Sequence, residues 1–393
     1  MKKRFIVLLA IVLFLFTEYS SYAGTEFPTK YNVPLSKEWT IKFNMVLDEN
    51  TINENNIYVL DSTGSKHDCE LILSDSKDSK TILVIPISDF LHDEKYTLHI
   101  EANIKSLSSN LLEEKVTMDF YTVVSDNLGE KITFSDPNLE SVVREKISKP
   151  LGNIYKKDVA GITDLKAKER NISTLGGIQY LTSLKTLYLP LNQIEDISNL
   201  KDLTELEELT IWDNQIENIT PLEKLQNLNN LSLSSNDITD ISAIRDLKNL
   251  KELYLDGNRI VDITPLEKMS NLEQLHLWGN KIEDTDPLKN LRHIRVLDLG
   301  SNQINKINFL GNLRNLEELF LWDNNIENIN SLRYLSGLKK LAISDNQITN
   351  IEPLGNLINL EELYLSDNNI TDYSPVEKYY DNLIHKDFEI DTD

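Results

Sequence analysis

Apolar residues recur along residues 165–372 with a period of 22. In one copy they alternate at Leu209 and Ile211, and then every third residue from Ile216 to Leu228 is apolar. Alternation predicts a short strand with one buried face, and the spacing of three predicts a tight return arm. A single turn of this kind cannot bury its own apolar set. The pattern therefore predicts stacked turns that share one continuous core.

An asparagine follows each predicted strand, where the chain has to bend. Its short amide can bond backbone groups of its own turn and of the next, which the bend would otherwise bury without partners. We therefore expect a structural ladder of asparagines rather than a set of ligand contacts. Its members are Asn192, Asn214, Asn236, Asn258, Asn280, Asn302, Asn324, Asn346 and Asn368.

The frame L-x-L-x-x-N-x-I-x-x-I-x-x-L-x-x-L-x-x-L resembles the leucine-rich repeat. The expected fold class is an α/β solenoid, a horseshoe of 22-residue repeats over 165–372. It has nine full turns that carry Asn and an atypical first turn in which Arg170 replaces it. Asp136-Pro137 begins an amphipathic helix, so 132–164 is predicted to be a helical cap. Residues 373–393 keep apolar positions and are predicted to be a C-terminal cap, with a partner-binding tail as the alternative.

Residues 28–124 have a different pattern. Short alternating runs separated by turn residues predict an all-β sandwich ahead of the repeats. Phe43-Asn44-Met45, Tyr96-Thr97-Leu98 and Phe120-Tyr121-Thr122 resemble the Ig-like domain of bacterial S-layer and surface proteins. The resemblance implies a spacer or stalk.

The repeats and their cap resemble the internalin family. The resemblance rests on Phe134-Ser135-Asp136-Pro137, on Gly177 to Leu181, and on Ile-Thr-Pro-Leu at Ile219 and Ile263. It implies an exported bacterial protein that binds a partner protein on the concave face of the array. The Ig-like segment precedes the cap, unlike the commoner domain order, and we find no wall-attachment motif. Retention on the cell is therefore left open.

Residues 1–23 are typical of a secretory signal peptide, with Lys2-Lys3-Arg4 before an apolar run and cleavage predicted after Ala23. An uncleaved anchor is the alternative. We expect a secreted or cell-surface location. The formal net charge of −23 argues against binding nucleic acid or an anionic membrane by bulk electrostatics. Cys69 is the only cysteine, so no internal disulfide is possible and an inert thiol is expected, with a reactive or intermolecular one as the alternative.

The second and fourth residues of each L-x-L-x-x-N point out of the strand and are left free by the fold. Three of the four tryptophans occupy such positions, and grouped exposed aromatics mark interaction surfaces. We expect a monomer that binds a protein partner there, a host-cell surface protein being one possibility. The candidate partner-binding residues are Tyr188, Trp212, Tyr254, His276, Trp278, Asp298, Gly300, Phe320, Trp322 and Tyr364.

Trp278 and Trp322 are two turns apart, about 10 Å at the usual strand spacing, with Gly300 between them. This predicts an open slot for an apolar or cationic side chain. The alternatives are that one Trp was copied by duplication or that the rings pack on each other. Nearby carboxylates such as Asp213 and Asp323 would favour a basic partner or remain solvated. Their single-file spacing provides no calcium loop.

The six histidines form no ligand set, and no catalytic or phosphate-binding motif is found. We expect no enzyme activity, no cofactor and no metal. The predicted function is partner binding by an adhesin-like protein. The alternatives are a structural envelope component that binds cell-wall polymer and, less favoured, an enzyme using an acidic pair.

Overall fold

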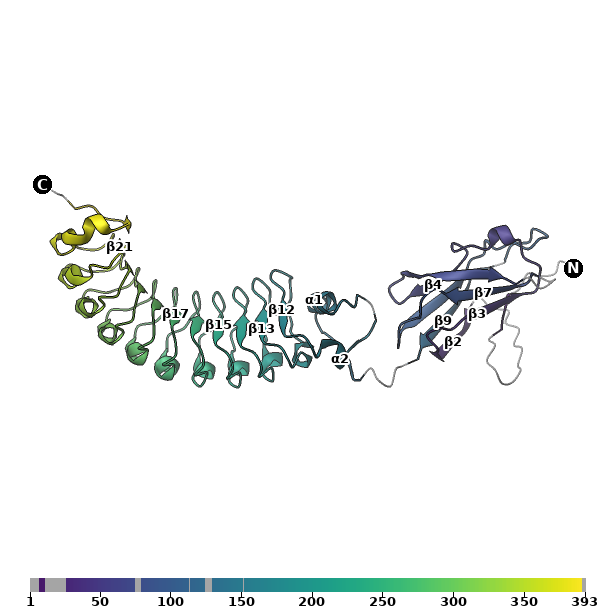
Figure 1. Cartoon of the computed structure of the whole chain (residues 1–393), viewed down its shortest axis with the longest axis horizontal. Coiled ribbons are helices and arrows are strands. Elements are labelled where there is room, and N and C mark those ends of the chain that lie inside the picture. The colour runs from purple at the N-terminus through teal and green to yellow at the C-terminus, as the bar shows by residue number, and fades with distance from the viewer. Residues whose placement is uncertain are drawn as a thin grey trace. The chain divides into compact units, whose positions relative to one another are not determined.

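The computed structural model describes residues 7–10 (backbone only), 26–74, 79–112, 114–123, 129–150 and 152–390. The chain divides into two compact units, residues 1–131 with 151–155, and residues 132–150 with 156–393 (Figure 1). No helix among the described residues has both the length and the apolar character that a bilayer span requires.

The first unit is a sandwich of two β-sheets. One sheet has the strand order β2 (Glu26–Val33), β9 (Val116–Thr122), β8 (Lys95–Ile100), β4 (Ile57–Asp61), β5 (Lys66–His67). The other has the order β1 (Val7–Ala10), β3 (Trp39–Phe43), β7 (Thr81–Pro86), β6 (Cys69–Leu73), and a short 3-10 turn, η1, covers Glu49–Thr51. Alternate residues of the longer strands are buried, as in β3 and β8. Trp39 and Phe120 meet in the core with ring centroids 4.8 Å apart, which confirms the predicted all-β sandwich.

Two sequence predictions concern this unit. Of the predicted signal peptide only Val7–Ala10 are described, as β1 paired antiparallel with β3, and the rest lies outside the described residues. Cys69 is half-buried, and burial raises the pKa of its thiol to about 11. Almost none of it is thiolate at neutral pH, which fits the expected inert residue.

The second unit begins with the helix α1 (Pro137–Ile147), where Leu139, Val142 and Val143 are buried. Asp136 caps this helix and fastens it to the first repeat. Its Oδ1 accepts the backbone N–H of Leu139, and its Oδ2 accepts that of Ser173. The short strand β10 (Lys131–Ile132) lies where the first unit ends, and the short strand β11 (Ile154–Tyr155) belongs to the first unit. The short helix α2 (Lys156–Val159) leads into the repeats.

The array is one parallel sheet of 11 strands in chain order. The strands are β12 (Asp164–Lys166), β13 (Thr186–Tyr188), β14 (Glu208–Thr210), β15 (Asn230–Ser232), β16 (Glu252–Tyr254), β17 (Gln274–His276), β18 (Val296–Asp298), β19 (Glu318–Phe320), β20 (Lys340–Ala342), β21 (Glu362–Tyr364) and β22 (His385–Lys386). Strand β22, in the C-terminal tail, was not predicted.

The return arms are 3-10 turns, as the spacing of three predicted, and they follow the outer curve of the array in Figure 1. They are η2 (Ile178–Tyr180), η3 (Ser198–Leu200), η4 (Thr220–Leu222), η5 (Ser242–Ile244), η6 (Thr264–Lys268), η7 (Asp286–Asn290), η8 (Asn308–Asn312), η9 (Asn330–Tyr334), η10 (Glu352–Asn356) and η11 (Ser374–Asn382). In the last of these Tyr379 is buried, and its hydroxyl donates to the carbonyl of Leu354 in the preceding turn.

The core and the asparagine ladder account for the repeated positions. Leu209 and Ile211, like their counterparts in the other turns, are fully buried. Asn214 donates from Nδ2 to the carbonyls of Leu189 and Ile211, and its Oδ1 accepts the N–H of Ile194. The other ladder asparagines repeat this arrangement turn by turn. Each one thus ties two neighbouring turns together through backbone groups.

The residue before each of these asparagines has a positive φ, a feature that the sequence analysis did not foresee. The positions are Leu191, Asp213, Ser235, Gly257, Gly279, Ser301, Asp323, Asp345 and Asp367, with φ between 47° and 67°. Glycine adopts this left-handed conformation freely, and Asp tolerates it better than most residues. The backbone conformation thus explains why Asp occurs at several of these positions, without any need for a charged partner.

Candidate functional site on the concave face

We call the exposed side of the 11-stranded sheet the concave face. Neighbouring strands are in register, so the second residue of each strand motif lies directly beside its counterparts in the next turns. His276, for example, pairs with Tyr254 on one side and with Asp298 on the other. Side chains from turns 22 residues apart in sequence thereby become immediate neighbours.

The aromatic candidates in the middle of the array are in contact. Tyr254 stacks on His276, with ring centroids 4.7 Å apart and planes at 18°. The ring centroids of Trp278 and Trp322 lie 6.0 Å apart, and the two ring planes meet at 34°. Trp278 keeps 40% of its surface exposed, whereas the frame residues Leu275 and Leu277 of the same turn are fully buried.

The predicted open slot between the two indoles is wrong. A Cβ placed on Gly300 would lie 2.6 Å from Cε2 and Nε1 of Trp322, so the Trp322 ring lies directly over this glycine. The missing side chain makes room for the protein's own ring, which then reaches Trp278. The result is a joined pair of indoles with an exposed outer surface, the ring-packing alternative of the sequence analysis.

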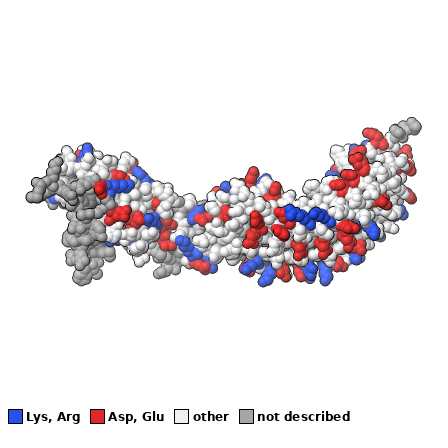
Figure 2. Space-filling view, turned by 180° about the vertical axis from the view of Figure 1, so that it is seen from behind, with Lys and Arg blue, Asp and Glu red and all other residues white. Residues whose placement is uncertain are grey.

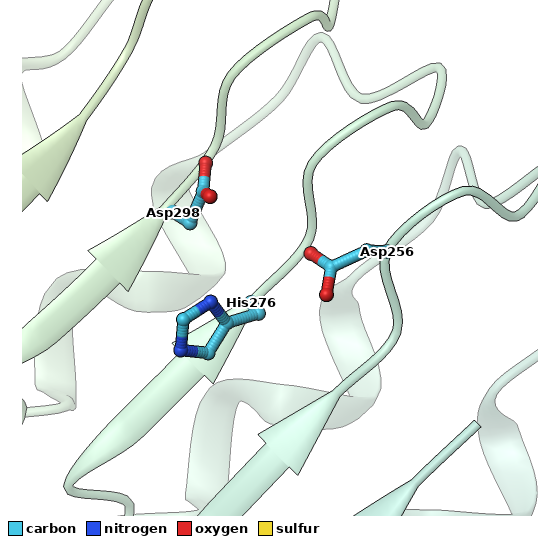
Figure 3. A group of neighbouring side chains, drawn as sticks. All are labelled: Asp256, His276 and Asp298. Atoms are coloured by element: carbon cyan, nitrogen blue, oxygen red, sulfur yellow. The ribbon is translucent and has the colours of Figure 1, made fainter. Parts of the chain in front are cut away.

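A group of polar side chains lies beside the indoles. Asp256, His276 and Asp298 come from three successive turns, and each offers a ligand-type atom within 4.8 Å of the others (Figure 3). Asp256 accepts the backbone N–H of Trp278 at 2.9 Å and the hydroxyl of Ser234 at 3.1 Å. Asp298 accepts the N–H of Gly300 at 3.0 Å.

Sequence reasoning missed this grouping because it considered the carboxylates as a single file along the array. Asp256 occupies the fourth position of its motif, whereas His276 and Asp298 occupy the second. The signal that could have found them is three ligand-type residues on consecutive turns of an in-register sheet. Burial raises the pKa of Asp256, and burial is also the main cause that raises the pKa of Asp298.

Of the remaining candidates, Phe320 lies beside Asp298 at the edge of this central group, and Tyr188, Trp212 and Tyr364 lie outside it. Thr210 and Ser232 separate Tyr188 from Tyr254, and Ala342 separates Phe320 from Tyr364. Trp212 lies instead near the amine of Lys168, 5.8 Å from its ring centroid, and Phe320 lies near Lys340 at 5.6 Å.

Charged side chains surround the array, and many of them form ion pairs between turns. Acidic and basic groups are intermingled on the side shown in Figure 2. Arg259 is paired with Asp237, Lys185 with Glu207, and Arg295 with Glu317. Such exposed pairs contribute little to stability, but they offset much of the local charge.

Family models match both parts of the chain. The model for leucine-rich repeats matches residues 182–224 and, in overlapping copies, 226–378, and the model for the bacterial Ig-like domain matches 27–122. No curated protein matches the sequence. The fold and its asparagine ladder thus define a leucine-rich repeat solenoid joined to a bacterial Ig-like domain.

Solved structures of similar proteins show which leucine-rich repeat proteins this chain resembles. An internalin C2 from Listeria monocytogenes is 32% identical, with a TM-score of 0.41, over 65% of this chain and 93% of that one. A leucine-rich repeat protein from Leptospira interrogans is 26% identical, with a TM-score of 0.56, over 59% of this chain and 62% of that one. The functional domain of InlJ from Listeria monocytogenes is 22% identical with a TM-score of 0.58, covers 67% of this chain and 62% of that one, and shows the fold alone. The chain belongs to the internalin-like leucine-rich repeat proteins.

Proposed function

We propose that this chain is a non-enzymatic, exported bacterial protein that binds a partner protein through the concave face. The observation that carries the proposal is the contrast between Trp278 and the frame of the repeat. The frame leucines and isoleucines are buried, while Trp278 keeps 40% of its surface exposed and is extended by Trp322. Trp and Tyr are the residues that most often anchor protein interfaces.

The composition of the face supports a compact anchor region with a polar surround. Tyr254, His276, Trp278, Phe320 and Trp322 occupy adjoining strands, β16 to β19, and their immediate exits. Small or polar residues lie on both sides, such as Ser232 towards the N-terminus and Ser344 towards the C-terminus. An apolar centre inside a polar rim is the usual anatomy of a protein–protein interface.

Export and surface location belong to the same proposal. The Ig-like domain is a bacterial type, the relatives include Listeria internalins, and residues 1–23 have the composition of a signal peptide. An exported chain has access to partners outside the cell, which is where a rigid binding surface of this kind would act.

The test is a capture experiment with the whole chain immobilised and surface proteins of candidate partner cells in solution. Wild type is compared with the double variant Trp278→Ser plus Trp322→Ser, and with Trp212→Ser as a matched control. Circular dichroism checks that all three are folded. A partner that is captured by wild type and control but lost by the double variant supports the proposal. Equal capture by the wild type and both variants overturns it, and pelleting with cell-wall sacculi in place of capture favours the envelope alternative.

A further inference from the structure

Three side chains on consecutive turns converge beside the indole pair. Asp256, His276 and Asp298 place ligand-type atoms within 4.8 Å of one another (Figure 3). A tetrahedral zinc site with bonds of about 2.0–2.2 Å has ligand atoms about 3.4 Å apart. The largest separation in the group therefore exceeds that spacing by at most about 1.4 Å, a difference that side-chain torsions can close without moving the strands.

The two carboxylates are held in place by their surroundings. Asp256 is fixed by the N–H of Trp278 and the hydroxyl of Ser234, and Asp298 by the N–H of Gly300. Hydrogen bonds of this kind orient the first ligands of a metal and are part of a built site. Both carboxylates are half-buried, so neither is a freely moving surface group.

The imidazole of His276 is positioned by ring stacking. It stacks on Tyr254 at 4.7 Å, which fixes the plane of the ring. Throughout the described residues, neither of its ring nitrogens takes part in a hydrogen bond. Neutral imidazole is a common metal ligand, and the ring of His276 lies within reach of both carboxylates.

The charge of the group is also unbalanced. No lysine or arginine among the described residues forms an ion pair with Asp256 or Asp298. Two carboxylates this close repel each other when both are ionised. A divalent cation would remove that repulsion.

We infer that Asp256, His276 and Asp298 form a binding site for a divalent transition-metal ion, with Zn²⁺ as the expected occupant. One imidazole and two carboxylates are ligands that Zn²⁺ accepts, and three protein ligands leave a fourth position for water. Calcium and magnesium are disfavoured because they require sets of oxygen ligands, six to eight for calcium, and do not prefer imidazole. The site goes beyond the proposed function and does not depend on it.

The experiment titrates the metal-free whole chain with Zn²⁺ by isothermal calorimetry. Wild type is expected to bind one ion, and His276→Ala and Asp298→Asn are each expected to weaken binding by about a hundredfold or more, because loss of a ligand should cost at least as much as the roughly 10–100-fold loss seen for residues that only orient the ligands. His293→Ala is the matched control, because His293 lies in the same unit, bonds the carbonyl of Ser270 and is not part of the group. Asp298→Asn keeps the shape of the side chain and its acceptor oxygen, so it separates loss of ligation from loss of fold.

A second readout uses Co²⁺ in place of Zn²⁺. A tetrahedral site gives strong visible absorption bands, which His276→Ala should abolish and His293→Ala should leave unchanged. Three results would overturn the inference. They are no Zn²⁺ binding by wild type, Zn²⁺ binding that survives both His276→Ala and Asp298→Asn, and Ca²⁺ binding as tight as that of Zn²⁺.

Discussion

Two turns of the array carry almost the same sequence and yet present different surfaces. Glu207–Asn214 and Glu317–Asn324 differ at only two positions, where Thr210 and Ile211 in one correspond to Phe320 and Leu321 in the other. Their backbones agree closely. Asp213 and Asp323 have φ of 56° and 55°, and both ladder asparagines are 9% exposed with equivalent hydrogen bonds.

The difference arises from the residues two turns earlier. Trp212 lies near the amine of Lys168, whereas Trp322 lies over Gly300 and meets Trp278. The same indole at the same motif position is therefore a partner of a cation in one turn and half of an aromatic pair in the other. The repeat determines the backbone position from which a side chain projects. The side chains of neighbouring turns determine which contacts it makes.

The largest loss of stability is expected from substituting the ladder asparagine, which is the same in both turns. Asn214→Leu and Asn324→Leu should each lower the free energy of unfolding by about 3 kcal/mol, because several buried backbone groups lose their partner. Urea unfolding followed by circular dichroism measures this. Similar losses are expected in both turns, and a loss in one turn only would show that the frame is not uniform.

The second prediction separates the two turns by function. Trp322→Ala should weaken partner binding by about thirtyfold, the loss typical of an interface anchor of about 2 kcal/mol, while Trp212→Ala should leave it nearly unchanged. Surface plasmon resonance with the captured partner measures both variants. If the two substitutions weaken binding equally, the indole pair is not special.

The third prediction disturbs the glycine on which the pair depends. Gly300→Ala places a methyl group against the Trp322 ring, so the ring must move away and the indole pair should separate. We expect a cost of about 1 kcal/mol in stability and a change in tryptophan fluorescence. Ser344→Ala, at the same motif position one turn after Trp322, is the control and should change neither.

The smallest effect concerns the charged edge of the second turn. Hydrogen bonds from Arg295 and Lys339 lower the pKa of Glu317 to about 2. Because the folded pKa lies below the ordinary value of about 4.3, the contribution of this carboxylate to stability is present above about pH 4 and is lost as pH falls towards 2. Carboxyl NMR should show this titration, and Arg295→Ala plus Lys339→Ala should return the pKa towards its ordinary value. A midpoint that stays near 2 in that double variant would assign the shift to another cause.

The buried positions and the asparagine ladder could be predicted from sequence because they depend only on the 22-residue period. Leucine at every 22nd position must be buried in stacked turns, and an asparagine at every bend must bond the backbone. The indole contact and the grouping of Asp256, His276 and Asp298 could not be predicted in the same way. They depend on side-chain torsions between residues that share no repeated position, and on which turns are neighbours. The left-handed residue before each asparagine was missed because Leu191 and Ser301 occupy it as well as Gly and Asp, so no single residue type marks it.

The constant length of the turns has a further consequence. From Asn192 to Asn368 no turn is longer or shorter than 22 residues, so a whole turn can be removed, copied or exchanged without shifting any other strand out of register. Recombination within the gene would then preserve the fold while giving every inserted turn new neighbours. Removing the single turn that carries Gly300 would bring Trp278 and Trp322 onto adjacent strand exits and remove Asp298 from the group around His276. In such an array a new surface can arise by reordering old turns, before any residue has mutated.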